Sequence, residues 1–206
     1  MDLVIVGAGK LGEYIALNYT QFNLRHRLIG FVDDNPKFKH KKVAGLPVLG
    51  TIEDFLLDKR VCVILALASC SEKMDMVQRL APNPKIDYPN VFSSGSWISR
   101  ECIVGKGNII LEGSLFNFGT LIGSFNSFER KCSIGHETII GDFCCFKEEV
   151  QTGGYTYIED GCQFGKGVIV NQGVKLEDIK EVHSHTMALQ QCYDFLDKHK
   201  WKLVET

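Results

Sequence analysis

The chain of 206 residues has a formal net charge of −2 and is 45% hydrophobic and 23% charged. This charge offers no electrostatic attraction to nucleic acid or to an anionic membrane, so we expect neither as a partner. No apolar run approaches the roughly 20 residues of a membrane-spanning helix, and the first residues lack the basic leader of a signal peptide. Eight cysteines without paired Cys-x-x-Cys motifs favour a cytoplasmic protein with free thiols and no metal site.

Residues 1–95 alternate apolar runs with amphipathic stretches. We expect strands over 3–9, 28–32, 61–68 and 88–92, with a short apolar segment at 46–49. Helical periodicity predicts helices over 10–20, 51–58 and 71–80. Strands that alternate with helices form a parallel sheet with helical crossovers. The sequence therefore predicts an α/β, Rossmann-like domain over residues 1–95, which is too small for a complete dinucleotide-binding fold.

A glycine motif follows the first predicted strand, where Gly7-Ala8-Gly9-Lys10-Leu11-Gly12 matches G-x-G-x-x-G. In such a loop the first glycine permits a tight turn, the second lets a phosphate approach the backbone, and the third lets helix and strand pack closely. The N-terminus of the next helix then offers free N–H groups. We expect the loop to bind a nucleotide substrate through Gly7, Gly9, Lys10 and Gly12. The alternative is a purely structural turn.

Two acidic residues, Asp33 and Asp34, follow the second predicted strand. Asp33 lies 21 residues after Gly12, which is about where an acidic side chain reaches a ribose hydroxyl or the edge of a base. We therefore expect both carboxylates to bind substrate. The alternative is that they only cap the loop before Pro36.

The second half of the chain repeats every six residues. Twelve of thirteen positions at this spacing are apolar: Val104, Ile110, Phe116, Ile122, Phe128, Ile134, Ile140, Phe146, Thr152, Ile158, Phe164, Val170 and Leu176. Against a 45% hydrophobic background, chance would produce this roughly a few times in a thousand. Glycine is also enriched at the position that follows, where it relieves a turn.

A small residue lies four positions after each apolar one, and four cysteines share this place: Cys102, Cys132, Cys144 and Cys162. We interpret them as inward-facing packing groups rather than redox or metal sites. Six residues form one face of a triangular prism and eighteen form one coil. The sequence predicts a left-handed parallel β-helix over residues 96–180, with its frame ending at Leu176. Residues 181–206 are expected to form a tail with an amphipathic helix at 186–199.

The glycine motif, the segment Phe31-Val32-Asp33-Asp34 and the hexad containing His136-Glu137 occur in a fixed order. Together they resemble the bacterial sugar acyltransferases of the sialic-acid O-acetyltransferase and UDP-amino-sugar N-acetyltransferase kind. The resemblance covers about residues 1–176. It implies that the N-terminal domain binds a nucleotide-sugar rather than NAD, that the β-helix forms a homotrimer, and that acetyl-CoA lies between neighbouring β-helices.

The resemblance also implies roles for particular residues. His136 would be the general base and Glu137 its acidic partner. Gly154, eighteen residues later, would face the thioester carbonyl with its amide. Cys145 stands where the family can carry a second histidine near the acyl group, and with Lys166 it completes the expected acyl-CoA-binding residues.

Two other functions remain open from the sequence. Glu129 replaces an asparagine of the amino-sugar N-acetyltransferases, which leaves a nucleotide-sugar-binding homologue without catalysis as the first alternative. The glycine loop alone would also fit an NAD-dependent oxidoreductase. The small N-terminal domain and the lack of a second catalytic domain argue against that function.

Overall fold

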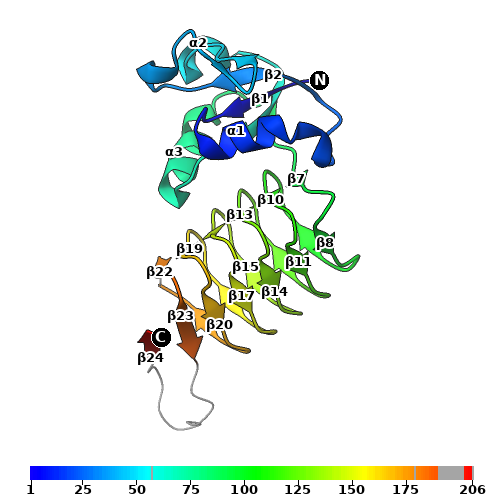
Figure 1. The fold of residues 1–206 in the computed structure, drawn as a ribbon, viewed down its shortest axis with the longest axis vertical. Coiled ribbons are helices and arrows are strands. Elements are labelled where there is room, and N and C mark those ends of the chain that lie inside the picture. Colours follow the sequence, from blue (N-terminus) through cyan, green and yellow to red (C-terminus); the bar gives the residue numbers. More distant parts are fainter. Residues whose placement is uncertain (57, 179, 190–201, 206) are drawn as a thin grey trace. The chain divides into compact units, whose positions relative to one another are not determined.

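A computed structural model describes residues 1–56, 58–178, 180–189 and 202–205 of the chain. By its internal contacts the chain divides into two compact units. The first comprises Met1–Ser94 with Lys106–Asn108, and the second comprises Gly95–Gly105 with Ile109–Thr206. Figure 1 shows the α/β elements of the first unit in blue to green and the coils of the second in green to orange.

The first unit contains a four-stranded parallel sheet in the order β2-β1-β5-β6. Its strands are β1 (Asp2–Val6), β2 (Arg27–Val32), β5 (Val61–Leu65) and β6 (Ile86–Asp87). Val6 pairs with Val32 on one side and with Leu65 on the other. The carboxyl ends of β1, β2 and β5 therefore meet at one edge of the sheet, where ligand sites of parallel α/β sheets lie.

Three α-helices accompany this sheet: α1 (Lys10–Leu17), α2 (Ile52–Leu56) and α3 (Cys70–Leu80). The unit also contains the 3-10 turns Tyr19–Gln21 and Pro36–Phe38, the hairpin β3 (Lys42–Val43) and β4 (Leu46–Pro47), and β7 (Val91–Phe92). Helix α1 ends at Leu17, before the predicted residue 20, and the Asn18 side chain caps this end by donating to the Tyr14 carbonyl. No helix in the described ranges is long and apolar enough to cross a membrane.

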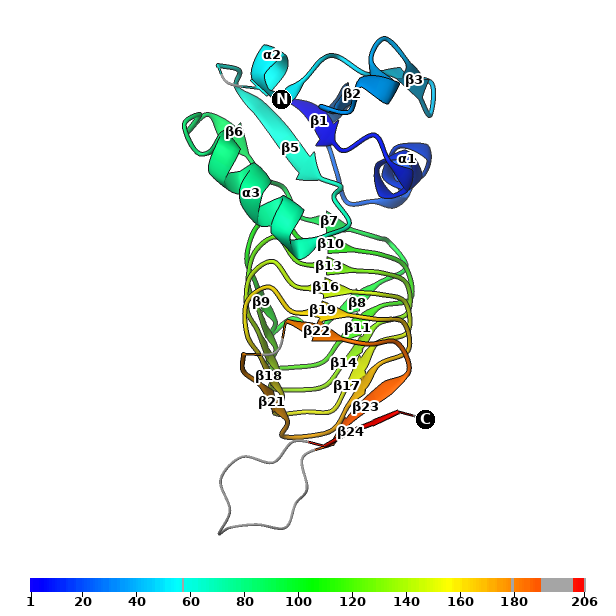
Figure 2. The same ribbon diagram turned by 90° about the vertical axis from the view of Figure 1, so that its left-hand side faces the viewer.

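The second unit is a parallel β-helix in which each short strand pairs with the strand three places further along the chain. One face contains β8 (Trp97–Ile98), β11 (Leu115–Phe116), β14 (Ser133–Ile134), β17 (Gln151–Thr152), β20 (Ile169–Val170) and β23 (Thr186–Leu189). The second contains β9 (Ile103–Val104), β12 (Leu121–Ile122), β15 (Ile139–Ile140), β18 (Tyr157–Ile158) and β21 (Lys175–Leu176). The third contains β10 (Ile109–Ile110), β13 (Ser127–Phe128), β16 (Cys145–Phe146), β19 (Gln163–Phe164) and β22 (Glu181–Val182). Figure 2 shows these coils stacked above one another.

The six-residue frame places the predicted residues inside this prism. Phe128, Phe146 and Phe164 are at most 1% exposed, and their rings stack at 4.5 and 4.6 Å between centroids. Cys132, in the small position, is fully buried, and burial raises the pKa of its thiol to about 12. A protonated, enclosed thiol is a poor nucleophile. The prediction that the repeat cysteines are packing groups agrees with this environment.

The β-helix continues beyond the predicted end of the frame. Val182 and Ala188, the next two positions of the six-residue series, are 1% and 2% exposed and lie on β22 and β23. The predicted helix at 186–199 is therefore wrong for residues 186–189, which pair in parallel with β20. A strand forms here because β20 would otherwise leave an unpaired edge. The opposite side of β23 pairs with β24 (Lys202–Glu205). Residues 190–199 lie outside the described part of the chain.

Candidate functional site

His136 lies at the corner of the β-helix that joins β14 to β15. Phe118 and Gly154 occupy the same corner one coil before and one coil after it, because one coil takes eighteen residues. The predicted placement of Gly154 directly beyond His136 thus agrees with the coil geometry. We call Phe118, His136, Gly154 and Tyr155 the His136 corner.

The imidazole of His136 is held by its neighbours in this column. The Phe118 ring stacks on it with centroids 5.2 Å apart and planes inclined by 11°. The Tyr155 ring meets it edge-on, at 4.9 Å and 86°. A Cβ atom on Gly154 would lie 2.6 Å from Nε2, 2.7 Å from Cε1 and 2.9 Å from Cδ2 of the imidazole. The ring therefore occupies its present position because residue 154 has no side chain, and a Cβ atom there would displace it.

The hydrogen bonds of this corner involve mainly the backbone. The Tyr155 N–H donates to the His136 carbonyl over 2.9 Å, and the Glu137 N–H donates to the Phe118 carbonyl over 2.9 Å. The His136 Nδ1 atom is buried and has no hydrogen-bond partner among the described residues. Over the same ranges, the Gly154 N–H donates no hydrogen bond within the chain. The corner thus combines a fixed imidazole with a free backbone donor beside it.

Glu137, the expected acidic partner, follows His136 directly but does not bond to the imidazole within the described structure. Its backbone is left-handed, with φ of 52°, and its side chain is exposed. Consecutive residues of a corner therefore have different surroundings, and adjacency in sequence does not bring the carboxylate to Nδ1.

The two other residues expected near the acyl group lie elsewhere on the β-helix. Cys145 is on β16, on the third face, and is 2% exposed. Lys166 is at a different corner, with its Nζ 3.9 Å from Glu149. Within one chain, the structure brings His136 and Gly154 together but not Cys145 or Lys166.

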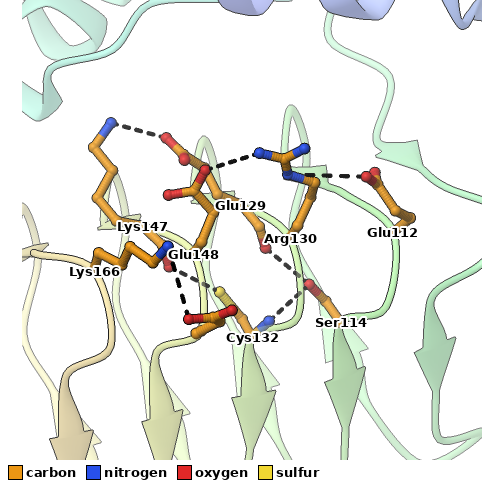
Figure 3. A network of polar contacts seen from close by, with 9 residues as sticks. Glu112, Ser114, Glu129, Arg130, Cys132, Lys147, Glu148 and Lys166 are labelled. Atoms are coloured by element: carbon orange, nitrogen blue, oxygen red, sulfur yellow. Dashed lines mark hydrogen bonds and ion pairs between the residues drawn. The ribbon is translucent and has the colours of Figure 1, made fainter.

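Lys166 belongs to a network of charged side chains that the sequence analysis did not predict (Figure 3). We call this network the charged corner; it comprises Glu112, Glu129, Arg130, Lys147, Glu148, Glu149 and Lys166. The shortest ion pairs join Lys147 to Glu129 at 2.8 Å and Arg130 to Glu148 at 3.0 Å. The hydrogen bond from Arg130 lowers the pKa of Glu148. Glu129, which stands where the amino-sugar N-acetyltransferases have an asparagine, thus forms an ion pair with Lys147. The sequence does contain a signal for this network: residues of opposite charge follow one another at a spacing of eighteen residues, which is one coil. They are Glu112, Arg130, Glu148 and Lys166.

The glycine motif of the first unit forms a turn with one open position. Gly7 has φ of +100°, and a Cβ there would lie 2.7 Å from the Ala66 carbonyl oxygen. A Cβ on Gly12 would collide with the Gly7 carbonyl. A Cβ on Gly9 would meet no atom within 4 Å. Gly7 and Gly12 are therefore required by the fold, whereas the space beside Gly9 remains for a ligand.

Asp33 and Asp34 lie next to this turn. Asp33 accepts hydrogen bonds from the Ala8 N–H at 2.7 Å and the Asn35 N–H at 2.8 Å. Asp34 accepts from the Ile52 N–H and pairs with Arg79 at 2.8 Å. These bonds orient both carboxylates at the carboxyl edge of the sheet, and the binding of substrate by the two aspartates stays a prediction.

Two cavities meet at these aspartates within the first unit. One of about 270 Å³ is lined by Gly7, both aspartates and apolar residues that include Val6 and Val32. The other, of about 370 Å³, extends from the aspartates toward Lys39. Lys10 lines neither; its side chain is 97% exposed and pairs with Glu13. Among the described residues, no group of three or more His, Cys, Asp or Glu side chains could hold a metal ion.

Comparison with known proteins found one family model for the N-terminal part of the chain, another for the C-terminal part, and solved structures with a similar fold. The model of the PglD N-terminal domain matches residues 2–80. The model of prephenate dehydratase matches residues 164–206, a stretch whose described strands β19 to β23 continue the β-helix. No curated protein matches the chain by sequence.

Solved structures resemble nearly the whole chain. The acetyltransferase domain of PglB from Neisseria gonorrhoeae FA1090, solved alone and with acetyl coenzyme A, is 17% identical with a TM-score of 0.72, covering 91% of this chain and 95% of that one. WeeI from Acinetobacter baumannii AYE is 19% identical with a TM-score of 0.58, covering 99% and 100%.

A variant of perosamine N-acetyltransferase from Caulobacter crescentus, solved with CoA and GDP-perosamine, is 17% identical with a TM-score of 0.50, covering 99% of this chain and 97% of that one. The resemblance expected from the sequence is thereby confirmed at the level of fold. The chain has an N-terminal α/β unit and a parallel β-helix, as these acetyltransferases do.

Proposed function

We propose that this protein is an acetyl-CoA-dependent acyltransferase that acetylates the amino group of a nucleotide-activated sugar. The observation that carries the proposal is the packing of the His136 imidazole against Gly154, whose N–H is free to donate. The structural likeness to the PglB acetyltransferase domain, solved with acetyl coenzyme A, supports the same chemistry.

The residues of the His136 corner fit the requirements of amide formation. Acetyl-CoA supplies a thioester, and an attacking amine forms the C–N bond while the C–S bond breaks and the thiol leaves. His136 accepts the proton that the amine loses, because histidine exchanges protons near neutral pH. The Gly154 N–H would donate a hydrogen bond to the carbonyl oxygen as negative charge develops there. The proton then passes from His136 to the departing thiolate.

The first unit would hold the nucleotide part of the acceptor. The open side of Gly9 and the N-terminus of α1 suit a phosphate, whereas Gly7 and the two aspartates line the adjoining cavities. The carboxylates accept hydrogen bonds, so they suit ribose hydroxyls or N–H groups of a base. A phosphate would lie away from them because of charge repulsion.

Assembly into a homotrimer is part of this proposal. Several large apolar side chains on the faces beside the His136 corner are exposed: Trp97 at 57%, Ile103 at 68%, Leu115 at 38%, Leu121 at 39% and Ile139 at 43%. Exposed apolar surface of this kind favours contacts between subunits. A neighbouring copy would be needed to bring Lys166 close to His136, whereas the side chain of Cys145 is already buried within its own chain. Three expectations from the sequence stay predictions: the left-handed coil, the Rossmann-like class of the first unit, and the cytoplasmic location. The described cysteines form no disulfide, which fits a cytoplasmic location.

The proposal is tested by incubating the full chain with acetyl-CoA and nucleotide-sugars that carry either an amine or only hydroxyl groups. We expect mass spectrometry to show the addition of one acetyl group to an amino sugar. Thermal stabilisation by a nucleotide-sugar without any transfer would contradict catalysis and favour the binding-protein alternative. Stabilisation by NAD alone would contradict both the acyltransferase proposal and the nucleotide-sugar-binding alternative.

A further inference from the structure

The charge that His136 gains during the proposed reaction has no carboxylate beside it. Glu137 makes no bond to the imidazole, and Nδ1 is buried without a hydrogen-bond partner across the described residues. A proton accepted at Nε2 turns the ring into a cation, and a cation at a half-buried position requires a favourable neighbour.

Phe118 provides such a neighbour. Its ring lies nearly parallel to the imidazole, with centroids 5.2 Å apart, which is within the range at which an aromatic face attracts a cation. The Phe118 side chain is 46% exposed, so core packing does not account for an aromatic residue here. On the other side of the ring Gly154 leaves only enough space for the flat imidazole. The plane of the ring is thus confined between Phe118 and Gly154.

We propose that Phe118 is a positioning residue for His136, holding the imidazole plane against Gly154 and stabilising its protonated form through the face of the phenyl ring. This inference rests on the proposed acyl transfer. It assigns to an aromatic ring the role that a hydrogen-bonded carboxylate has in other general-base histidines.

The same β-helix contains a matched control. Phe125 and Phe143 stack at another corner with the same separation of 5.2 Å and the same inclination of 11°. Neither residue contacts His136 in the described structure. Loss of the Phe143 ring reports the structural cost of breaking a corner stack, and any additional effect at Phe118 belongs to the histidine.

The experiment compares Phe118→Leu, Phe118→Tyr and Phe143→Leu in the full-length protein. In acetyl transfer, we expect Phe118→Leu to lower kcat about fivefold at unchanged KM. It should also move the midpoint of the pH–rate profile about half a unit lower, because the cationic form loses its aromatic partner. Phe118→Tyr should keep kcat and the midpoint of the pH–rate profile at their wild-type values, since tyrosine retains an aromatic face. Phe143→Leu should change only the melting temperature.

A second readout does not depend on activity. In proton NMR, the ring current of Phe118 should shift the His136 ring protons upfield, and Phe118→Leu should remove this shift while Phe143→Leu retains it. If Phe118→Leu matches Phe143→Leu in kcat, midpoint and spectrum while His136→Gln is inactive, the inference is wrong and the acyltransferase proposal stands. A fully active His136→Gln protein would overturn both.

Discussion

The His136 corner and the charged corner are built on the same backbone but differ in how their side chains depend on one another. At both, the third corner residue is left-handed, with φ of 52° at Glu137, 56° at Tyr155, 60° at Lys131 and 64° at Glu149. The charged corner joins its side chains by ion pairs that are partly exposed to water. The His136 corner combines an aromatic stack, a glycine whose Cβ would touch the imidazole, and a ring nitrogen that has no hydrogen-bond partner in the described part of the chain.

The difference means that the ion pairs of the charged corner affect mainly the stability of the fold, whereas the packing at the His136 corner affects the proposed reaction. Partly exposed ion pairs contribute about 0–1 kcal/mol each, and the loss of one leaves others in place. The imidazole lies between the ring of Phe118 and the backbone of Gly154, so a change at either residue alters its immediate surroundings. Substitutions of His136 and Gly154 should therefore cause large changes in rate, whereas substitution of an ion-pair residue of the charged corner other than Lys166, such as Glu148, should cause only a small change in the free energy of unfolding.

The largest effect is expected for His136→Gln. Removing a general base should lower kcat by roughly 10²–10⁴, and KM for both substrates should change little, because the imidazole acts once proton transfer begins. Steady-state kinetics of acetyl transfer measure both constants. The matched control is His183→Gln, an exposed histidine at the end of the charged corner, which should retain wild-type rates. A folded His136→Gln protein with unchanged kcat would refute the assignment.

Gly154→Ala should have the second-largest effect. Its new methyl group would overlap Nε2 of His136, and a displacement of about 1 Å can lower kcat by roughly 10²-fold. Gly123→Ala is the comparison, because its methyl group would meet Asp142 and Gly141 at a corner without a histidine. We expect both variants to lose thermal stability but only Gly154→Ala to lose activity beyond the loss of folded protein. Equal specific activities of the folded fractions would contradict this.

Gly9→Val tests the other unit of the chain. The backbone at Gly9 is extended, with φ of −76°, and a Cβ atom there would meet no atom within 4 Å. We expect the fold to survive and affinity for nucleotide-sugars to fall at least about tenfold, because the side chain fills the space of a phosphate. Calorimetric titration gives the affinity, and an unchanged response to acetyl-CoA is the internal control. Unchanged nucleotide-sugar affinity would mean that the loop is only a structural turn.

The smallest effect is expected for Glu148→Gln at the charged corner. Arg130 lowers the pKa of Glu148 below its ordinary value of 4.5, so this pair stabilises the fold above that value and the stabilisation is lost as pH falls below it. Solvent screening keeps the contribution under about 1 kcal/mol. Thermal unfolding from pH 7 downward should show a small deficit of the variant that vanishes in acid, with kcat unchanged. A deficit that persists in acid would contradict the ion-pair account.

The sequence predicted the β-helix well because one phase of the repeat continues through every coil without insertion. The same phase located Gly154 beside His136, since eighteen residues separate equivalent corner positions. Phe118 stands at this spacing too, but a search for acid–base partners does not select an aromatic ring. The C-terminal error has a physical cause: Leu189, Cys192, Tyr193 and Leu196 recur at helical spacing in the sequence, whereas the unpaired edge of β20 favours a strand over residues 186–189.

In the first unit, the sequence predicted the order of strands and helices but not what the aspartates contact. Asp33 was expected to bind substrate, and its observed partner is the Ala8 N–H of the glycine loop. That contact joins residues 25 positions apart, and it depends on how β1 and β2 align in the sheet. Short-range patterns carry no information on such a register.

The most direct test of the central claim is the single-turnover rate of acetyl transfer as a function of pH, measured for the wild type and His136→Gln. We predict that the wild-type rate rises along one limb near neutral pH and then levels off, because the unprotonated imidazole is the active form. The variant should be slower by roughly 10²–10⁴ and should lack that limb. A folded variant that retains both the limb and the wild-type rate would show that another group accepts the proton.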